Sequence, residues 1–274
     1  MRIAGLCGLG LVALTTSSFA ADMPTLRGSQ AFAPAEPVYF RWQGVYFGGH
    51  AGYSTGSADL SQGTKDLVAY IMRNTMEEEQ MNVSSWTTLP THNGVSGAGW
   101  GGFIGYNAQW DDAVLGVELN YTRVNMQANA SDSMSRYMML TDGYYHAVSV
   151  STNAGINLTD LGTARLRGGW AASWFMPYAF IGVAVGRADV TRSATVSERV
   201  SDANWNLLYT VAPQTASDNR TAAYAFGYTA GLGIDVAMTS NVFLRAEYEY
   251  VNFSDFQSLK LNVNTVRAGL GAKF

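Results

Sequence analysis

Several charged residues in this sequence occur at every second position, and that spacing limits the chemistry they could do. Arg245, Glu247 and Glu249 alternate with apolar residues, as do Arg165 and Arg167. Residues two apart in a strand lie on one face, so charges from several strands converge wherever those faces meet. The set expected on that face is Glu118, Arg165, Arg167, Asp235, Arg245, Glu247, Glu249, Arg267 and Lys273.

Three kinds of chemistry are open to such a set of facing acids and bases. They can pair into a structural ion network, line a narrow path for polar solutes, or exchange protons during catalysis. Charges gathered in a confined space must pair or stay hydrated. We favour the structural network and keep the solute path as the alternative. We expect no catalytic residues and no enzyme, because no nucleophile and base accompany these charges.

The three histidines are the other candidates for chemistry. His146 lies near Ser149 and Ser151, but in a strand this spacing gives no catalytic mechanism, so we interpret it as a loop histidine. Together with His50 and His92 it could offer haem ligands, yet no local motif marks a haem site. We therefore expect no cofactor.

The acidic run 77–79 resembles a cation site only in its charge. It lacks the spaced Asp and Asn residues of a calcium loop, so we expect a solvated face and no metal. The surrounding residues 64–81 form the one helix-like stretch, with apolar residues at i, i+3 and i+4 and Thr64 as a candidate cap. Neither a P-loop nor a paired-histidine metal motif occurs in the sequence.

The elements that would position the inward charges are strands with one apolar and one polar face. In residues 113–122, Leu115, Val117 and Leu119 alternate with Gly116 and Glu118. Aromatic residues stand near the ends of the apolar faces, where two membrane–water interfaces would fall. The same alternation recurs in residues 45–54, 100–110, 226–236, 242–250 and 264–274.

Composition supports a barrel in a membrane. Only 14% of residues are charged, against roughly 25% in ordinary soluble domains, while Gly and Tyr number 29 and 15. Mean hydropathy is close to zero, as expected when the two faces of each strand cancel. A secreted β-sandwich or lipocalin-like barrel, with its apolar face inward, is the soluble alternative. The net charge of −4 argues against nucleic acid as a partner.

The N-terminus indicates export. Residues 1–20 combine a positive start, an apolar run and small residues before a cleavage site between Ala20 and Ala21, as a signal peptide does. The single cysteine, Cys7, lies within it, so the mature chain should contain no thiol and no disulfide. Residues 21–41 are rich in proline and predict an extended periplasmic lead-in.

Connection lengths predict the number of strands in residues 42–274. Bacterial outer-membrane barrels have short periplasmic turns and long outer loops, so short and long connections must alternate. Short connections are expected at 111–112, 173–177 and 239–241, and long ones at 55–96, 126–161, 190–221 and 254–262.

The alternation predicts an all-β fold, an eight-stranded antiparallel up-and-down transmembrane barrel with long extracellular loops and both termini periplasmic. Residues 146–158 also look like a strand, and we place them in the second outer loop as a hairpin above the membrane. The fifth strand, residues 178–186, is apolar throughout, so the pattern does not decide which face points inward.

Four stretches carry a resemblance to a known family. The stretches "YFGGHAGYS", "RLRGGWAASWFMPYAFIGVAVG", "AGLGIDVAMTSNVFLRAEYEYVNF" and "VRAGLGAKF" resemble the small surface β-barrels of alphaproteobacteria, the porin-like or opacity-protein-like outer-membrane group. The leader "ADMPTLRGS" is similar too. The resemblance implies an eight-stranded barrel in the Gram-negative outer membrane. It also implies that the assembly machinery reads the last strand through its terminal aromatic, Phe274.

These observations lead to an expected function. The interior of an eight-stranded barrel is just filled by side chains. We expect a structural, surface-exposed barrel that supports envelope integrity and presents its loops, with a narrow porin-like channel as the alternative. The expected partners are outer-membrane lipid, lipopolysaccharide and the assembly machinery, and the sequence does not identify the loop partners.

Overall fold

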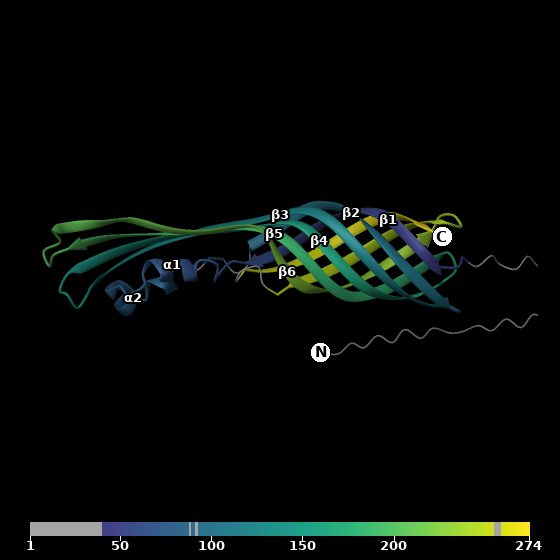
Figure 1. The fold of residues 1–274 in the computed structure, drawn as a ribbon, viewed down its shortest axis with the longest axis horizontal. Helices are drawn as coiled ribbons and strands as arrows, with labels where there is room; N and C mark the ends of the chain where they lie inside the picture. Colours follow the sequence, from purple (N-terminus) through teal and green to yellow (C-terminus); the bar gives the residue numbers. More distant parts are fainter. Residues whose placement is uncertain (1–39, 88, 91–92, 255–258) are drawn as a thin grey trace, which may run out of the picture. The chain divides into compact units, whose positions relative to one another are not determined.

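The computed structural model describes residues 40–87, 89–90, 93–254 and 259–274. The expected signal peptide, and the lead-in up to residue 39, lie outside the described residues. Eight antiparallel strands form a closed barrel in chain order, because β1 pairs with both β2 and β8 (Figure 1). The expected all-β fold, a closed barrel of eight antiparallel strands, is confirmed. The strands are β1 Gly44–Asp59, β2 Asn93–Trp110, β3 Ala113–Met139, β4 Tyr145–Trp170, β5 Phe175–Ser201, β6 Leu207–Ala237, β7 Val242–Phe253 and β8 Lys260–Lys273.

The barrel has its apolar face outside. Leu115, Val117 and Leu119 in β3 are each more than half exposed, whereas Glu118 and Asn120 between them are at most 5% exposed. Exposed aliphatic residues beside buried polar ones are the reverse of a soluble barrel. The apolar-out arrangement, which the signal peptide, the aromatic residues and the low total charge favoured, is therefore the observed one, and the soluble alternative is wrong.

Three short connections gather at one end of the barrel, which we call the turn end. They are residues 111–112, 171–174 and 238–241, and they confirm the three expected turns. Asp111 and Ser173 adopt left-handed backbone with φ of 49° and 58°, as tight turns often require. The second turn is shorter than expected, because Pro177 already pairs within β5.

At the opposite end the expected loops 126–161 and 190–221 are wrong as loops, because most of their residues are strand. Strands β3 to β6 continue past the barrel as a four-stranded sheet, visible at the left of Figure 1. We call this part, residues 126–139, 145–158, 188–201 and 207–220, the sheet extension. Residues 146–158 lie within β4, so they form no ninth strand.

Irregular pairing marks the point where strands leave the barrel. The register shifts between Arg123 and Met126, between Leu158 and Asp160, and between Ala188 and Val190. Such bulges bend and re-twist a strand. They allow the same chains to pass from a closed barrel into an open sheet.

The connection between β1 and β2 covers one face of the sheet extension with short helices. These are α1 Lys65–Ile71, α2 Met76–Met81 and the 3-10 turn η1 Val83–Ser85. Their apolar side chains pack on the sheet, which explains why the strands persist there. The cluster consists of Val68, Met72, Val83, Trp86, Val148, Val150, Ala194 and Val196. In the described part of the chain, no helix has the length and apolarity needed to cross a membrane.

The predicted helix over 64–81 is interrupted. Thr64 occupies the N-cap of α1 but makes no side-chain cap, contrary to expectation. The capping hydroxyl belongs instead to Thr75, whose Oγ1 accepts a hydrogen bond from the Glu78 backbone N–H at 3.2 Å. A second helix therefore begins at Met76.

The structure also shows which face of β5 points inward. Tyr178 and Phe180 are buried in the lumen, while Ile181 and Val183 are exposed outside. Inward glycines make room for these rings. A Cβ on Gly233, for example, would lie 2.4 Å from Cζ of Tyr178.

Candidate functional site

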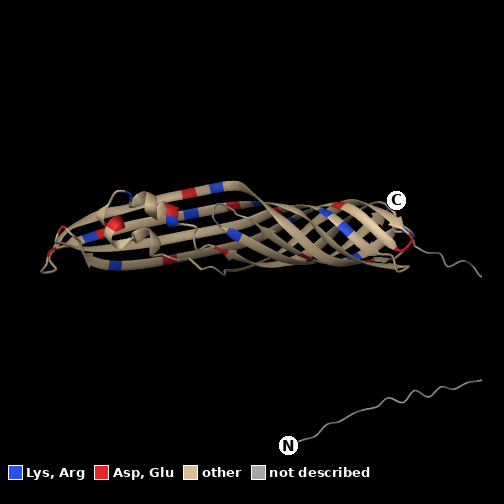
Figure 2. Cartoon of the chain, turned by 90° about the horizontal axis from the view of Figure 1, so that it is seen from below, with Lys and Arg blue, Asp and Glu red and all other residues tan. Residues whose placement is uncertain are grey.

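Eight charged residues from five strands occupy the middle of the barrel lumen, and each is at most 4% exposed. Figure 2 shows acidic and basic positions on the barrel strands and along the sheet extension. All eight were expected on the inward face. They are Glu118 on β3, Arg165 and Arg167 on β4, Asp235 on β6, Arg245, Glu247 and Glu249 on β7, and Arg267 on β8.

Strand register places opposite charges beside one another. Glu118 pairs across strands with Arg165, Asp235 with Arg245, and Glu247 with Arg267. Directly opposed side chains on one face have their Cβ atoms about 4.5–5.5 Å apart, within reach of an ion pair. The hydrogen-bond ladder of the barrel thus sets the charge pattern of the lumen.

Two acids join the arginines nearer the turn end. Asp235 lies 2.6 Å from Nη2 of Arg167 and 2.8 Å from Nε of Arg245. Glu118 Oε2 lies 2.7 Å from Nη1 of Arg245 and 3.2 Å from Nη1 of Arg167. Each acid therefore bridges both arginines.

Arg165 and Arg267 complete the other half of the network. Arg165 lies 2.8 Å from both Glu247 Oε1 and Glu249 Oε1, and 3.5 Å from Glu118 Oε1. Arg267 is paired with Glu247 and lies 3.0 Å from Glu249 Oε2. The contact between Arg165 and Glu118 joins the two halves, so the eight residues form one continuous network.

Neutral hydroxyls also donate hydrogen bonds to these carboxylates. Tyr46 donates to Glu118 Oε2 at 2.8 Å, and Tyr178 donates to Glu247 Oε2 at 2.7 Å. Thr229 donates to Glu249 at 2.7 Å. The role of Tyr178 escaped the sequence analysis because the facing of its strand was undecided.

Aromatic rings cover the guanidinium planes. The Cζ atom of Arg167 lies 3.8 Å from the centroid of the Tyr178 ring, and that of Arg245 lies 4.0 Å from the Phe103 centroid. A cation over a ring face is attracted by the ring quadrupole, more strongly where water is excluded.

Two apolar clusters enclose the charged layer. Toward the turn end it meets the rings of Trp42, Tyr46, Phe103, Tyr178, Phe180 and Phe243. Toward the sheet extension it is followed by a cluster that includes Leu60, Leu89, Met126, Leu158, Phe253 and Leu259. The network therefore lies between two layers of packed apolar side chains.

The network is balanced in formal charge, with four arginines and four carboxylates. A buried charge is strongly destabilising unless it is paired and hydrogen-bonded. Each of the eight residues has at least two partners of opposite charge. The arrangement can cross-link five strands through the lumen.

Other expected residues lie apart from this network. Lys273 lies at the turn end, where its ammonium donates to the Arg41 carbonyl. His50 is in the lumen, with Nε2 3.0 Å from the Thr122 hydroxyl. His92 lies outside the described residues, as do Ala20 and Ala21.

The terminal Phe274 is exposed on the outside of the barrel. Its ring stacks on Phe47 of β1, with centroids 5.6 Å apart and planes 11° from parallel. Its backbone N–H donates to the Val45 carbonyl at 2.9 Å. The C-terminus thus closes the seam between the first and last strands.

Arg192 is a buried charge in the sheet extension that the sequence analysis missed. It donates to the Gly63 carbonyl at 3.0 Å and lies 3.1 Å from Asp66 and 2.6 Å from Asp218. These contacts fasten the start of α1 to the extension. The hydrogen bond from Arg192 lowers the pKa of Asp218 despite its small desolvation.

Two expectations about the extension are wrong. Glu77 is only 8% exposed, so the acidic run is no uniformly solvated face, and His146 is a buried strand residue of β4 and not a loop histidine. Burial lowers the pKa of His146, but hydrogen bonds with Glu198 and Asp142 outweigh it and hold the pKa above its ordinary value. The sequence did not predict that Glu77, His146 and Glu198 lie together, because they come from three separate segments of the chain.

A closed antiparallel barrel with an aliphatic exterior and a charged interior defines a transmembrane β-barrel protein. The family model of the outer membrane protein beta-barrel domain matches residues 25–274. The chain belongs to this family, and its location is the outer membrane.

Two named relatives share this location. The chain is 28% identical over 191 residues to a 22 kDa outer membrane protein of Rhizobium leguminosarum bv. viciae, covering 64% of this chain and 67% of the relative. It is 24% identical over 174 residues to a 25 kDa outer-membrane immunogenic protein of Brucella ovis, covering 64% and 62%. The expected alphaproteobacterial family is thereby confirmed.

Solved structures give a weaker likeness. OprG from Pseudomonas aeruginosa is 14% identical with a TM-score of 0.36, covering 85% of this chain and 96% of OprG. Neisserial surface protein A is also 14% identical, with a TM-score of 0.35, covering 84% and 97%. Scores this low add nothing to the family assignment.

Replacing one acid should show how much the pairing of charges in the lumen contributes to stability. Asp235→Asn leaves Arg167 and Arg245 short of one buried partner, so we expect a loss of about 3–5 kcal/mol in the free energy of unfolding. Urea unfolding of the barrel refolded into lipid vesicles measures it. Asp112→Asn, in an exposed turn, is the matched control and should be neutral.

The double variant Arg245→Met/Asp235→Leu restores equal numbers of charges. It should recover part of the loss, because apolar replacement of a whole buried pair is often near neutral. A single variant as stable as the control would show that pairing in the lumen contributes little.

Proposed function

We propose that this protein is a structural, surface-exposed outer-membrane barrel whose lumen is closed and whose sheet extension projects from the cell. The observation that supports it is the neutral eight-residue network held between two apolar clusters. Such an interior suits a rigid support for an external sheet. We assign no catalytic role to it.

The proposed orientation follows the exposed aromatic residues and the connection lengths. Exposed rings near the turn end include Phe47, Trp110 and Trp170, while Trp100 and Tyr121 lie nearer the sheet extension. Aromatic girdles of this kind sit at the two membrane–water interfaces. Short turns of bacterial barrels are periplasmic, so the turn end faces the periplasm and the extension faces outward.

A porin-like channel for solutes is the less well supported function. Solute would have to pass the charged layer and both apolar clusters, which requires parting arginines from acids at 2.6–2.8 Å in a buried setting. Breaking a buried pair costs about 3–5 kcal/mol, and several pairs would open together. The geometry therefore supports a structural role with a closed lumen better than a role as a solute channel.

The proposed partners follow from the same placement. The exposed apolar side chains around the barrel contact outer-membrane lipid. The end of the barrel next to the sheet extension contacts lipopolysaccharide. The tip of the extension carries exposed aromatic residues, including Tyr137 and Trp205, with Trp205 stacked on Tyr145 at 4.4 Å. An exposed aromatic tip suits contact with other macromolecules, and the Brucella ovis relative is named immunogenic.

Single cysteines test the orientation, because the one native cysteine is Cys7 in the expected signal peptide. Ala203→Cys, at the exposed tip between β5 and β6, should react with a membrane-impermeant maleimide on intact cells. Ser240→Cys, exposed at the turn end, should react only after lysis. The reverse labelling pattern would invert the barrel and sink the proposal of an external extension.

We further propose that Phe274 is the residue read during assembly into the outer membrane. Its packing on Phe47 contributes at most roughly 1.5–3 kcal/mol, so a chain lacking Phe274 should still refold nearly normally into detergent. In cells its outer-membrane level should fall sharply, as measured by quantitative blotting of membrane fractions. Equal losses in both assays would make Phe274 a packing residue only.

A further inference from the structure

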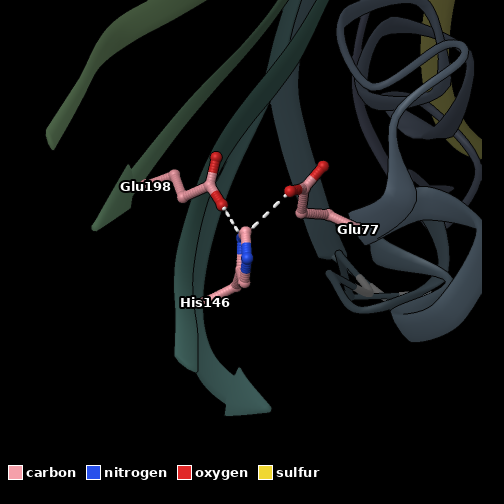
Figure 3. A group of neighbouring side chains, drawn as sticks. All are labelled: Glu77, His146 and Glu198. Carbon is pink, nitrogen blue, oxygen red and sulfur yellow. Dashed lines mark hydrogen bonds and ion pairs between the residues drawn. The ribbon is translucent and has the colours of Figure 1, made fainter. Parts of the chain in front are cut away.

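Three residues from separate elements converge in the sheet extension (Figure 3). Glu77 is the second residue of α2, His146 lies at the start of β4, and Glu198 lies near the end of β5. Because Glu198 pairs with Val148, it lies diagonally across from His146 on the same sheet face. His146 is 2% exposed and Glu77 8% exposed, so the group is largely removed from water.

Both glutamates approach the same ring nitrogen. The distance from Nδ1 of His146 is 3.1 Å to Glu77 Oε1 and 2.5 Å to Glu198 Oε1. One nitrogen carries at most one proton, so it can donate to one carboxylate but not properly to both. The second carboxylate is left facing an already occupied donor.

The charges around this nitrogen are also unbalanced. Asp142 lies 2.9 Å from the other ring nitrogen, Nε2, which brings a third carboxylate to the group. Among the described residues, His146 is the one basic side chain within 4.0 Å of Glu77, Asp142 or Glu198. With all three carboxylates ionised, even a protonated imidazole would leave two negative charges uncompensated, unlike the balanced lumen.

We propose that Glu77, His146 and Glu198 bind a divalent first-row transition metal, with Zn²⁺ as its representative. One imidazole nitrogen with carboxylate oxygens suits Zn²⁺ and its neighbours, whereas Ca²⁺ and Mg²⁺ prefer oxygen alone. The three ligand atoms lie within 4.8 Å of one another. Tetrahedral bonds of about 2.0–2.2 Å would hold them roughly 3.3–3.6 Å apart, so modest side-chain motion suffices.

Asp142 provides a separate observation in favour of a metal. Metal-binding histidines almost always donate their other ring N–H to a carboxylate or carbonyl, which fixes the tautomer. Donation from Nε2 to Asp142 leaves the Nδ1 lone pair directed at the two glutamates. Asp142 is thus a positioning residue and not a ligand.

Metal binding would fasten α2 to the sheet extension. The three ligands come from α2, β4 and β5, so one ion ties the β1–β2 connection to the strands beneath it. Three protein ligands leave a coordination position for water or an external donor. This inference does not depend on whether the barrel conducts, nor on which way it faces.

Calorimetric titration of Zn²⁺ into the full processed protein, purified from membranes without a histidine tag, tests the site. The wild type should bind one ion per chain. His146→Gln and Glu198→Gln should weaken binding by at least about tenfold, and Asp142→Asn by about 10–100-fold. Glu79→Gln, at an exposed position on the same helix, is the matched control and should bind as the wild type does.

Limited proteolysis gives a second readout. Zn²⁺ should slow trypsin cleavage at the exposed Arg73 in the wild type and in Glu79→Gln, but not in His146→Gln. The heat-dependent gel shift of a folded barrel confirms that each variant is folded. Asp142→Asn changes a group outside the ligand set, so it still tests the proposal if His146→Gln fails to fold.

Two results would overturn the proposal. One is a folded wild type with no saturable binding at about 1 mM Zn²⁺. The other is binding that keeps its affinity in His146→Gln or in Glu198→Gln, which would place the ion elsewhere.

Discussion

The pairing of four arginines with four carboxylates inside the barrel is the constraint on which the rest of the structure depends. Lipid requires an apolar exterior, so period-two strands must turn their polar faces inward. Inside a narrow lumen those charges are tolerated only in balance. Register supplies that balance, because Asp235 faces Arg245 and Glu247 faces Arg267 across neighbouring strands. The aromatic and aliphatic clusters on either side then exclude water from the network.

In the sheet extension, the faces of the strands are covered in a different way from those in the barrel. Once β3 to β6 leave the barrel, they are no longer part of a closed wall, and the β1–β2 connection packs on one of their faces through Val68, Met72 and Trp86. The buried Arg192 fastens that connection by pairing with the exposed Asp66 and the partly exposed Asp218. The cluster around His146 departs from this rule, because it has more carboxylates than bases, and that excess is what a metal ion would neutralise.

How far the sequence predicts this structure depends on whether a strand has two unlike faces. Arg245, Glu247 and Glu249 alternate with apolar residues, so their inward placement could be predicted. Which face of β5 points inward could not be predicted, since Tyr178, Phe180, Ile181 and Val183 are all apolar or aromatic. Loops were expected where the sheet extension lies, because the connections are long. The alternation of residue types that continues through these connections was not considered. The group around His146 joins residues 69 and 52 positions apart, from Glu77 to His146 and from His146 to Glu198, and no local pattern reports such contacts.

Single-channel recording of the purified barrel in planar lipid bilayers tests the central claim, that the balanced network closes the lumen. The account predicts no steady open conductance for the wild type, because every charged side chain in the middle layer is engaged by a partner and both neighbouring layers are apolar. Steady open levels whose ion selectivity changes with Glu118→Gln would show that ions pass the network, and would contradict the closed barrel.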